Sequence, residues 1–119
     1  MTIKLQDAEL KVMDVIWRCG EVSAKAVSLE LTERYGWKKN TTYTLIKRCI
    51  DKGAIERIEP NFICRALIPR EEVRKAETNE FINKIYDGSA DKLVAALLGR
   101  DNLSPEQVEK LKQIVKELE

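Results

Sequence analysis

Histidine is absent from this chain of 119 residues. That absence removes the commonest general base, the commonest zinc ligand and the usual partner of a catalytic cysteine or serine. The sequence also contains no glycine-rich phosphate loop and no cluster of metal-ligating residues. We therefore expect no enzyme, no cofactor and no metal site.

Cysteines and long apolar runs are scarce as well. Cys19, Cys49 and Cys64 are far apart and form no C-x-x-C or C-x-C pair. Because there is no signal peptide and no apolar run near the roughly 18 residues of a membrane helix, we expect reduced thiols in a cytoplasmic protein without membrane insertion. Cys49 continues an apolar stripe at helical spacing and is expected to be a small core residue.

Charge is plentiful, and the net charge of +1 averages two unlike parts. Residues 1–75 carry 15 Lys or Arg against 11 Asp or Glu, whereas residues 76–119 carry 6 against 9. Five basic residues and no acid fall between Arg34 and Arg48. That local positive field is what a polyanion such as nucleic acid would meet.

The first part of the chain predicts two helices and a short extended piece. Apolar residues recur at helical spacing from near Leu5 to Cys19, where Gly20 ends the helix. Val22 follows as a very short extended segment. Ser23 is a suitable N-cap for a helix over residues 24–35. We expect the inner face of that second helix to consist of Ala26, Val27, Leu31 and Tyr35.

A third helix is predicted after Gly36. It begins at Asn40 or Thr41, either of which can cap the free backbone N–H groups, and runs to Lys52. Two helices of about this length joined by a glycine-containing turn are typical of a helix-turn-helix. The expected inner face comprises Thr42, Leu45, Ile46, Cys49 and Ile50.

A β-hairpin is predicted directly after Gly53. Residues 54–59 alternate apolar and charged, Pro60 and Asn61 form a turn, and residues 62–68 are again extended and apolar. Three helices followed by a hairpin is the order of a winged helix. The predicted fold is thus mainly α with a small β-hairpin, with a winged helix-turn-helix DNA-binding domain over residues 1–69.

Residues 70–119 predict a helical dimerisation region. Helices are expected from Pro69 to Tyr86, from Lys92 to Leu98, and after the capping box that Ser104 begins. They carry more apolar surface than a piece of this size can bury alone, which favours a homodimer. The alternative is that they fold back on the N-terminal core. The predicted dimerisation residues are Phe81, Ile85, Tyr86, Leu93, Val94, Leu97, Val108, Leu111, Ile114, Val115 and Leu118.

The third helix and the hairpin supply candidate contacts to double-stranded DNA. Phosphate contacts supply most of the affinity, and contacts to base edges supply the specificity. We expect base contacts from Thr41, Tyr43 and Thr44, and phosphate or guanine contacts from Lys47 and Arg48. Each side chain alone could equally be a solvated surface residue, and a winged helix that docks a protein is the alternative function. The remaining candidates are Lys38, Lys39, Arg57 and Arg65 for phosphates, Asn61 for the minor groove or a phosphate, and Asn40 beside them.

Three segments carry a resemblance to a known family: DAELKVMDVIW, the T-x-x-T-L-x-x-R pattern from Thr41 to Arg48, and FINKIYDG. The chain resembles the penicillinase and methicillin-resistance repressors of bacteria, which are related to copper-responsive repressors. The resemblance implies a homodimeric winged-helix repressor on a palindromic operator of a β-lactamase or antibiotic-resistance operon. It also implies a membrane sensor-protease as partner, whose signal leads to a cut in the dimerisation region.

Two departures from the family pattern concern regulation. The family's Asn-Phe cleavage dipeptide is replaced by Ala96-Leu97, and the C-terminal C-x-C pair of the copper branch is missing. Copper sensing through that pair is therefore not expected. The sequence leaves open the operator, the regulated genes and the inducer, and whether proteolysis, a ligand or thiol oxidation releases the DNA.

Overall fold

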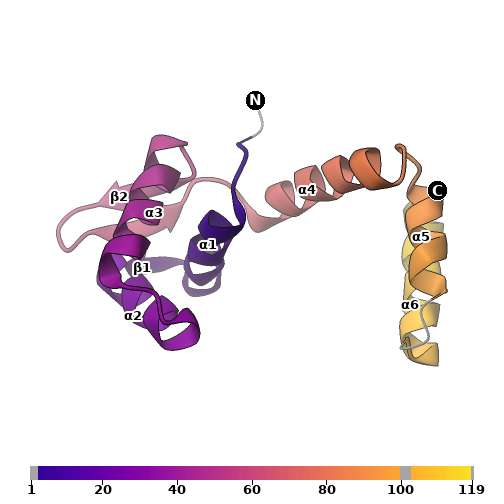
Figure 1. The fold of residues 1–119 in the computed structure, drawn as a ribbon, viewed down its shortest axis with the longest axis horizontal. Coiled ribbons are helices and arrows are strands. Elements are labelled where there is room, and N and C mark those ends of the chain that lie inside the picture. Colours follow the sequence, from indigo (N-terminus) through magenta and orange to yellow (C-terminus); the bar gives the residue numbers. More distant parts are fainter. Residues whose placement is uncertain (1–2, 100–102, 119) are drawn as a thin grey trace. The chain divides into compact units, whose positions relative to one another are not determined.

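The computed structural model describes residues 3–99 and 103–118, without the side chains of residues 115, 117 and 118. The chain divides into two compact units, residues 1–74 and 75–119. Helix α4 begins in the first unit and ends in the second. The elements are α1 (Asp7–Cys19), β1 (Glu21–Ser23), α2 (Ala24–Tyr35), α3 (Lys39–Asp51), β2 (Ile55–Ile58), β3 (Ile63–Ala66), α4 (Arg70–Ile85), α5 (Ala90–Leu98) and α6 (Pro105–Leu118) (Figure 1).

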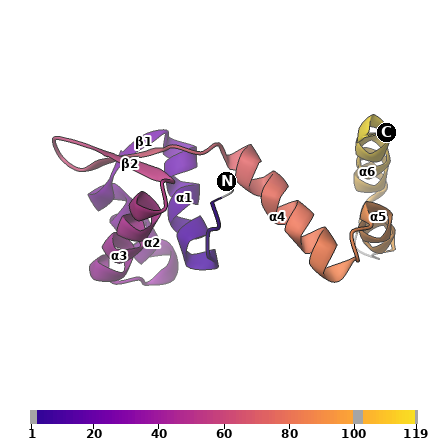
Figure 2. The same cartoon turned by 90° about the horizontal axis from the view of Figure 1, so that it is seen from above.

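The first unit is three helices and a small antiparallel sheet with strand order β1-β3-β2. The predicted hairpin is present as β2 and β3, and its loop projects beyond the helices in both views (Figures 1 and 2). The extended piece predicted at Val22 is β1, which pairs with β3. The prediction of a mainly α protein with a small hairpin is confirmed, with β1 added to the sheet.

The core of the first unit receives side chains from every one of its helices. On α3, Thr42, Leu45, Ile46 and Cys49 are buried, as the apolar stripe predicted, and Ile50 packs against them. The hairpin adds Ile55 and Cys64, and the start of α4 adds Val73. The opposite side of α3 is therefore free to face solvent or a partner.

Two expectations for the helices were wrong. Helix α3 begins at Lys39 after an extended Lys38, which makes no side-chain capping bond. The predicted caps, Asn40 and Thr41, lie inside the helix, because the Lys38 carbonyl already accepts the N–H groups of Thr41 at 3.0 Å and of Thr42 at 3.3 Å.

On α2, Ala26 and Tyr35 are exposed. The Ser23 side chain caps this helix by accepting the Ala26 N–H at 3.1 Å. With that start the inner face is Ala24, Val27, Ser28 and Leu31, spaced as one helical stripe. The Tyr35 ring instead meets the ammonium of Lys11, 4.9 Å from its centroid.

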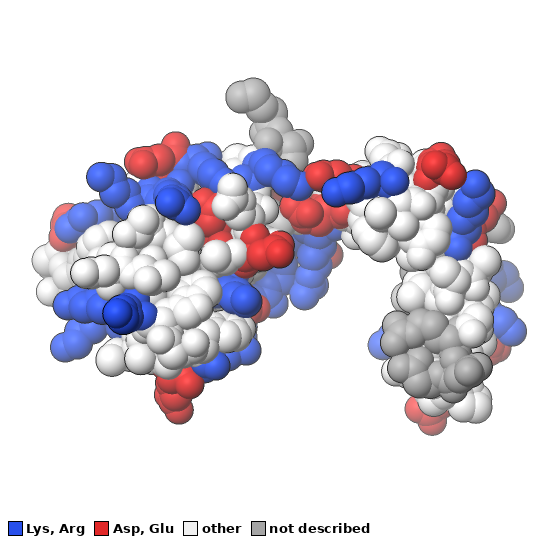
Figure 3. All heavy atoms as spheres, viewed as in Figure 1, with Lys and Arg blue, Asp and Glu red and all other residues white. Residues whose placement is uncertain are grey.

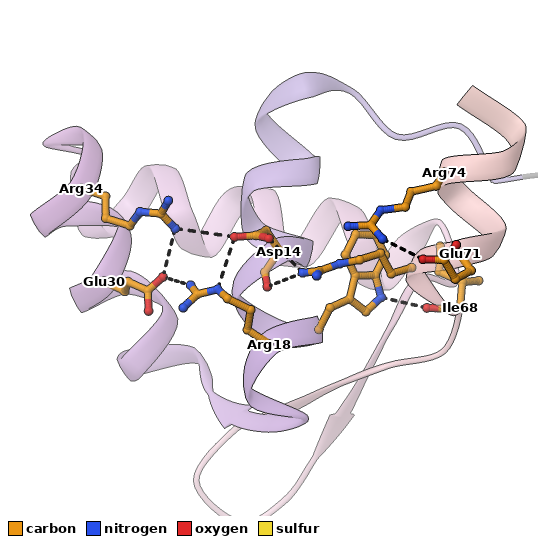
Figure 4. A network of polar contacts seen from close by, with 9 residues as sticks. Asp14, Arg18, Glu30, Arg34, Ile68, Glu71 and Arg74 are labelled. Atoms are coloured by element: carbon orange, nitrogen blue, oxygen red, sulfur yellow. Dashed lines mark hydrogen bonds and ion pairs between the residues drawn. The ribbon is translucent and has the colours of Figure 1, made fainter. Parts of the chain in front are cut away.

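Polar contacts tie the first turn of α4 to α1 (Figure 4). The Trp17 indole donates to the Ile68 carbonyl at 2.9 Å, and Arg70 donates to the Asp14 carboxylate at 2.9 Å. Asp14 also pairs with Arg18 at 3.4 Å and with Arg34 of α2 at 3.5 Å. Together with the buried Val73, these contacts explain why the first unit includes the beginning of α4.

The second unit is helical but has no core of its own among the side chains that the structure describes there, since none of them is buried. The expected helices are present, but α4 ends at Ile85 rather than Tyr86, and α5 begins at Ala90 rather than Lys92 because Ser89 caps it. Ser104 and Gln107 form both bonds of the capping box, at 2.9 and 3.2 Å. Within the described ranges, no helix is long and apolar enough to span a bilayer.

Candidate nucleic-acid interface

The exposed side of α3 combines hydroxyl groups with cations. Thr41 and Thr44 are exposed near its start, and Lys47 and Arg48 follow one turn later. In the described part of the chain, Lys38, Lys39, Lys47 and Arg48 make no ion pair with a carboxylate. In Figure 3 the uncharged surface over α3 is bordered by Lys and Arg. This is the distribution that an interface needs when bases are read at the centre and phosphates are held at the edges.

One flank of α3 borders a hollow of about 540 Å³. The candidate residues Asn40, Thr41, Thr44 and Arg48 are brought together along it. Sequence reasoning missed the rest of its lining. That lining is Ala8 at the start of α1, Trp37 in the turn before α3, and Leu45.

The other flank of α3 faces the hairpin. Tyr43 is half-buried, and its ring meets the Phe62 ring edge-on at a centroid distance of 5.9 Å. The Lys39 ammonium lies 5.5 Å from the centroid of the Tyr43 ring. Phe62 was not among the candidates, and the only signal for it was an aromatic residue directly after the Pro60-Asn61 turn. Asn61 is exposed at that turn, with φ of 75°.

The two hairpin arginines differ from the cations of α3 because each is paired with a carboxylate. Arg57 pairs with Glu59, and Arg65 pairs with Glu56 and lies 3.9 Å from Glu21. The structure thus separates the candidate cations into an unpaired set on α3 and a paired set on the hairpin.

An ion pair at the end of α3 stabilises the position of this helix against α1. The Glu9 carboxylate accepts hydrogen bonds from the Lys52 ammonium at 2.6 Å and from the Gln6 N–H at 2.7 Å. Burial raises the pKa of Glu9, but these two bonds and the charges of Lys52 and Arg48 together hold the pKa below its ordinary value. This pair fixes the start of α1 against the end of α3.

The two buried thiols, Cys49 and Cys64, are poorly suited to metal binding or redox chemistry. Burial raises the pKa of Cys49 to about 12 and that of Cys64 to about 11, so both stay protonated at neutral pH. Cys19 is exposed. No group of three or more metal-ligating side chains occurs in residues 3–99 and 103–118.

The candidate dimerisation residues lie on α4, α5, α6 and the turn after α4. Phe81, Ile85 and Ile114 are exposed, and Phe81 meets the Tyr86 ring at 5.6 Å. Leu93, Val94, Val108 and Leu111 are half-buried, as is Leu97. Val115 and Leu118 are in α6, but their side chains lie outside the described residues.

Comparison with known proteins gives the family of this chain. A family model described as penicillinase repressor matches residues 5–117. The penicillinase repressor of Bacillus licheniformis is 31% identical over 116 residues, covering 96% of this chain and 91% of that protein. The methicillin resistance regulatory protein MecI of Staphylococcus aureus is also 31% identical over 116 residues, covering 96% of this chain and 94% of that protein.

A solved structure is similar in fold. It is the solution structure of the monomeric form of Bacillus licheniformis BlaI in complex with the blaP half-operator, 31% identical to this chain with a TM-score of 0.53. The match covers 60% of this chain and 90% of that one. The winged-helix prediction and the resemblance drawn from the sequence motifs are both confirmed, and the chain belongs to the penicillinase repressor family.

Proposed function

We propose that this protein is a transcriptional repressor that binds a palindromic DNA operator of a β-lactamase or related antibiotic-resistance operon as a homodimer. The observation that carries the proposal is the exposed side of α3, where hydroxyl groups are bordered by cations without carboxylate partners. The similar BlaI structure, which is a complex with half-operator DNA, supports DNA as the partner. The protein acts in the cytoplasm on double-stranded DNA and needs no cofactor.

The roles proposed for α3 follow from its two chemistries. Thr41 and Thr44 contact base edges, because a threonine can touch a thymine methyl or hydrogen-bond a base. For Tyr43 we propose that the hydroxyl group makes the base contact, because the ring packs against Phe62. Lys47 and Arg48 contact phosphates or guanine, while Lys38 and Lys39 contact phosphates at the N-terminal end of the helix.

The dimer is proposed to form through the second unit. Its described side chains include no buried residue, and Phe81, Ile85 and Ile114 are 46, 55 and 45% exposed. An apolar hollow of about 260 Å³ opens between α5 and α6, lined mainly by leucine and isoleucine. A helical unit without a core gains its stability by burying such surface against a second copy. Pairing also links two winged-helix units, called heads below, each of which binds a half-site weakly alone.

A membrane sensor-protease is the proposed upstream partner, but the place of a cut stays open, because Ala96-Leu97 replaces the Asn-Phe dipeptide at which the family is cut. Ala96 and Leu97 stand in α5 where the family has its cleavage dipeptide. Ala96 is exposed and Leu97 is half-buried, facing the hollow between α5 and α6. A cut there would separate α6 from the rest of the chain and remove half of the surface proposed for pairing.

Salt dependence of duplex binding tests the DNA proposal. Each neutralised phosphate contributes about −0.9 to the slope of log affinity against log salt. If all four unpaired cations, Lys38 and the three in α3, contact phosphates, the slope is about −3.6 per head and about −7 for a dimer. The measurement is fluorescence anisotropy of a labelled duplex from 50 to 300 mM salt, roughly the range in which such slopes are resolved. A slope near zero would contradict the proposal and favour a winged helix that docks a protein.

A further inference from the structure

The hairpin, residues 55–66, contains two arginines that look equivalent in the sequence but differ in the structure. We propose that Arg57 contacts a DNA phosphate, that Phe62 positions it by joining the hairpin to α3, and that Arg65 takes no part in binding. This inference rests on the proposed DNA-binding function. It adds a positioning residue and divides the hairpin cations into one that binds and one that is structural.

The strand register places the two arginines on opposite faces of the sheet. Arg57 is directly opposite Cys64, and Arg65 is directly opposite Glu56. Residues paired across two antiparallel strands point to the same face, and neighbours along a strand point to opposite faces. Since Cys64 is fully buried, Arg57 leans over the face that the helices cover. The charge of Arg57 also acts against the rise in the pKa of Cys64, as expected for a guanidinium near that thiol. Arg65 points to the opposite, outer face.

Phe62 connects Arg57 to the recognition helix. The guanidinium carbon of Arg57 lies 3.7 Å from the centroid of the Phe62 ring, which is stacking distance. The same ring also meets Tyr43 of α3, edge-on at 5.9 Å and 81°. Phe62 has φ of 49°, so the backbone after the turn brings its ring back toward α3. The Phe62 ring therefore contacts both α3, through Tyr43, and the Arg57 cation.

The charge around each arginine separates them further. Arg65 sits on the central strand with a carboxylate from each neighbouring strand, because Glu21 and Glu56 are both its register partners. The three side chains of Glu21, Arg65 and Glu56 together carry a net negative charge and would repel a phosphate. Arg57 has one carboxylate partner, Glu59, which is exposed beside the hairpin turn. A phosphate can take the place of Glu59, and the carboxylate limits affinity by competing for the same guanidinium.

The two ion pairs provide matched variants for the test. We would first use the unaltered protein to select a duplex from random DNA. The affinity of each full-length variant for that duplex would then be measured as a function of salt concentration. Arg57→Gln is expected to make the slope of log affinity against log salt shallower by about 0.9 per head, or about 1.8 for a dimer. At 0.1 M salt this change lowers the affinity by up to roughly 60-fold. Arg65→Gln should leave slope and affinity unchanged. Glu59→Gln should raise affinity and Glu56→Gln should not.

Phe62 is tested by the same readout. Phe62→Leu should reproduce the shallower salt slope of Arg57→Gln. The double variant, Arg57→Gln with Phe62→Leu, should lose no more affinity than either single variant, because the two residues act as one unit. Phe62→Tyr, which keeps the ring, should restore the slope. Thermal unfolding of each variant separates a loss of fold from a loss of contact, and Arg57→Gln keeps the test decisive if Phe62→Leu does not fold.

Three results would overturn the inference: equal slopes for Arg57→Gln and Arg65→Gln, additive losses in the double variant, or no gain from Glu59→Gln. If these occur while the unaltered chain keeps a steep slope, the role of the hairpin is wrong and the DNA-binding function stands. If the unaltered chain shows no salt dependence, the proposed function and the inference fail together.

Discussion

The ion pair between the buried Glu9 and the partly exposed Lys52 gives the most demanding prediction for stability. Glu9 is 1% exposed and Lys52 is 34% exposed, and their charged atoms are 2.6 Å apart. Lys52→Met leaves the carboxylate buried without its cation. Breaking a buried pair costs about 3–5 kcal/mol, and the partial exposure of Lys52 points to the lower end, about 3 kcal/mol at pH 7. Glu9→Gln combined with Lys52→Met removes both charges and should recover most of that loss.

The dependence of stability on pH should change sign in the variant. In the unaltered protein the pKa of Glu9 lies below its ordinary value of 4.5, so its contribution is complete above that pH and is lost as pH falls through the folded-state pKa. Without Lys52, burial becomes dominant and raises the folded-state pKa above the unfolded one. The unfolding free energy of Lys52→Met should therefore rise as pH falls from 7 toward 5, while that of the unaltered protein should not.

Urea unfolding at fixed protein concentration, at pH 7 and pH 5, measures both effects. Lys25→Met is the matched control, because Lys25 is an exposed lysine on α2 and should change the unfolding free energy by less than about 0.5 kcal/mol. A Lys52→Met variant as stable as Lys25→Met, or one that weakens on acidification, would refute the account of this pair.

Further predictions concern the core, the thiols, base readout and the dimer. In urea titrations, Thr42→Val should either leave the unfolding free energy unchanged or raise it, by at most about 1 kcal/mol. The reason is that the buried Thr42 hydroxyl has no hydrogen-bond partner within the described residues. An aromatic disulfide reagent at pH 7 should modify Cys19 quickly and the other two thiols only after unfolding, with Cys19→Ser as control. Thr44→Ala should relax discrimination at one base position per half-site in a binding-site selection, and an unchanged motif would remove Thr44 from base readout. Ile114→Asp should shift sedimentation toward the monomer, whereas the exposed polar control Lys112→Asp should not.

The order of elements was predictable because each helix and strand has a clear period. The inner face of α3 followed from its apolar stripe, and Gly20 and Gly36 marked the ends of α1 and α2. The start of α3 was not predictable from capping preference. The backbone of Lys38 begins the helix, since its carbonyl accepts the N–H groups of Thr41 and Thr42, although its side chain makes no capping bond.

The differences within the site depend on contacts that the sequence does not contain. Arg57 and Arg65 both look like exposed hairpin arginines in the sequence, and only the strand register shows that they point to opposite faces. Strands of four residues, as β2 and β3 are, fix their register weakly by alternation alone. The role of Phe62 likewise appears only once α3 and the hairpin are placed together.

The most direct test of the central claim is a selection of DNA sites from a random duplex library by the full chain. An α3 that reads bases, carried on two heads joined through the second unit, predicts two inverted copies of one short motif. Their centres should be separated by about 10–10.5 base pairs or a multiple of that spacing, so that both heads face the same side of the duplex. Recovery of no motif, or of a single half-site without an inverted partner, would contradict the claim.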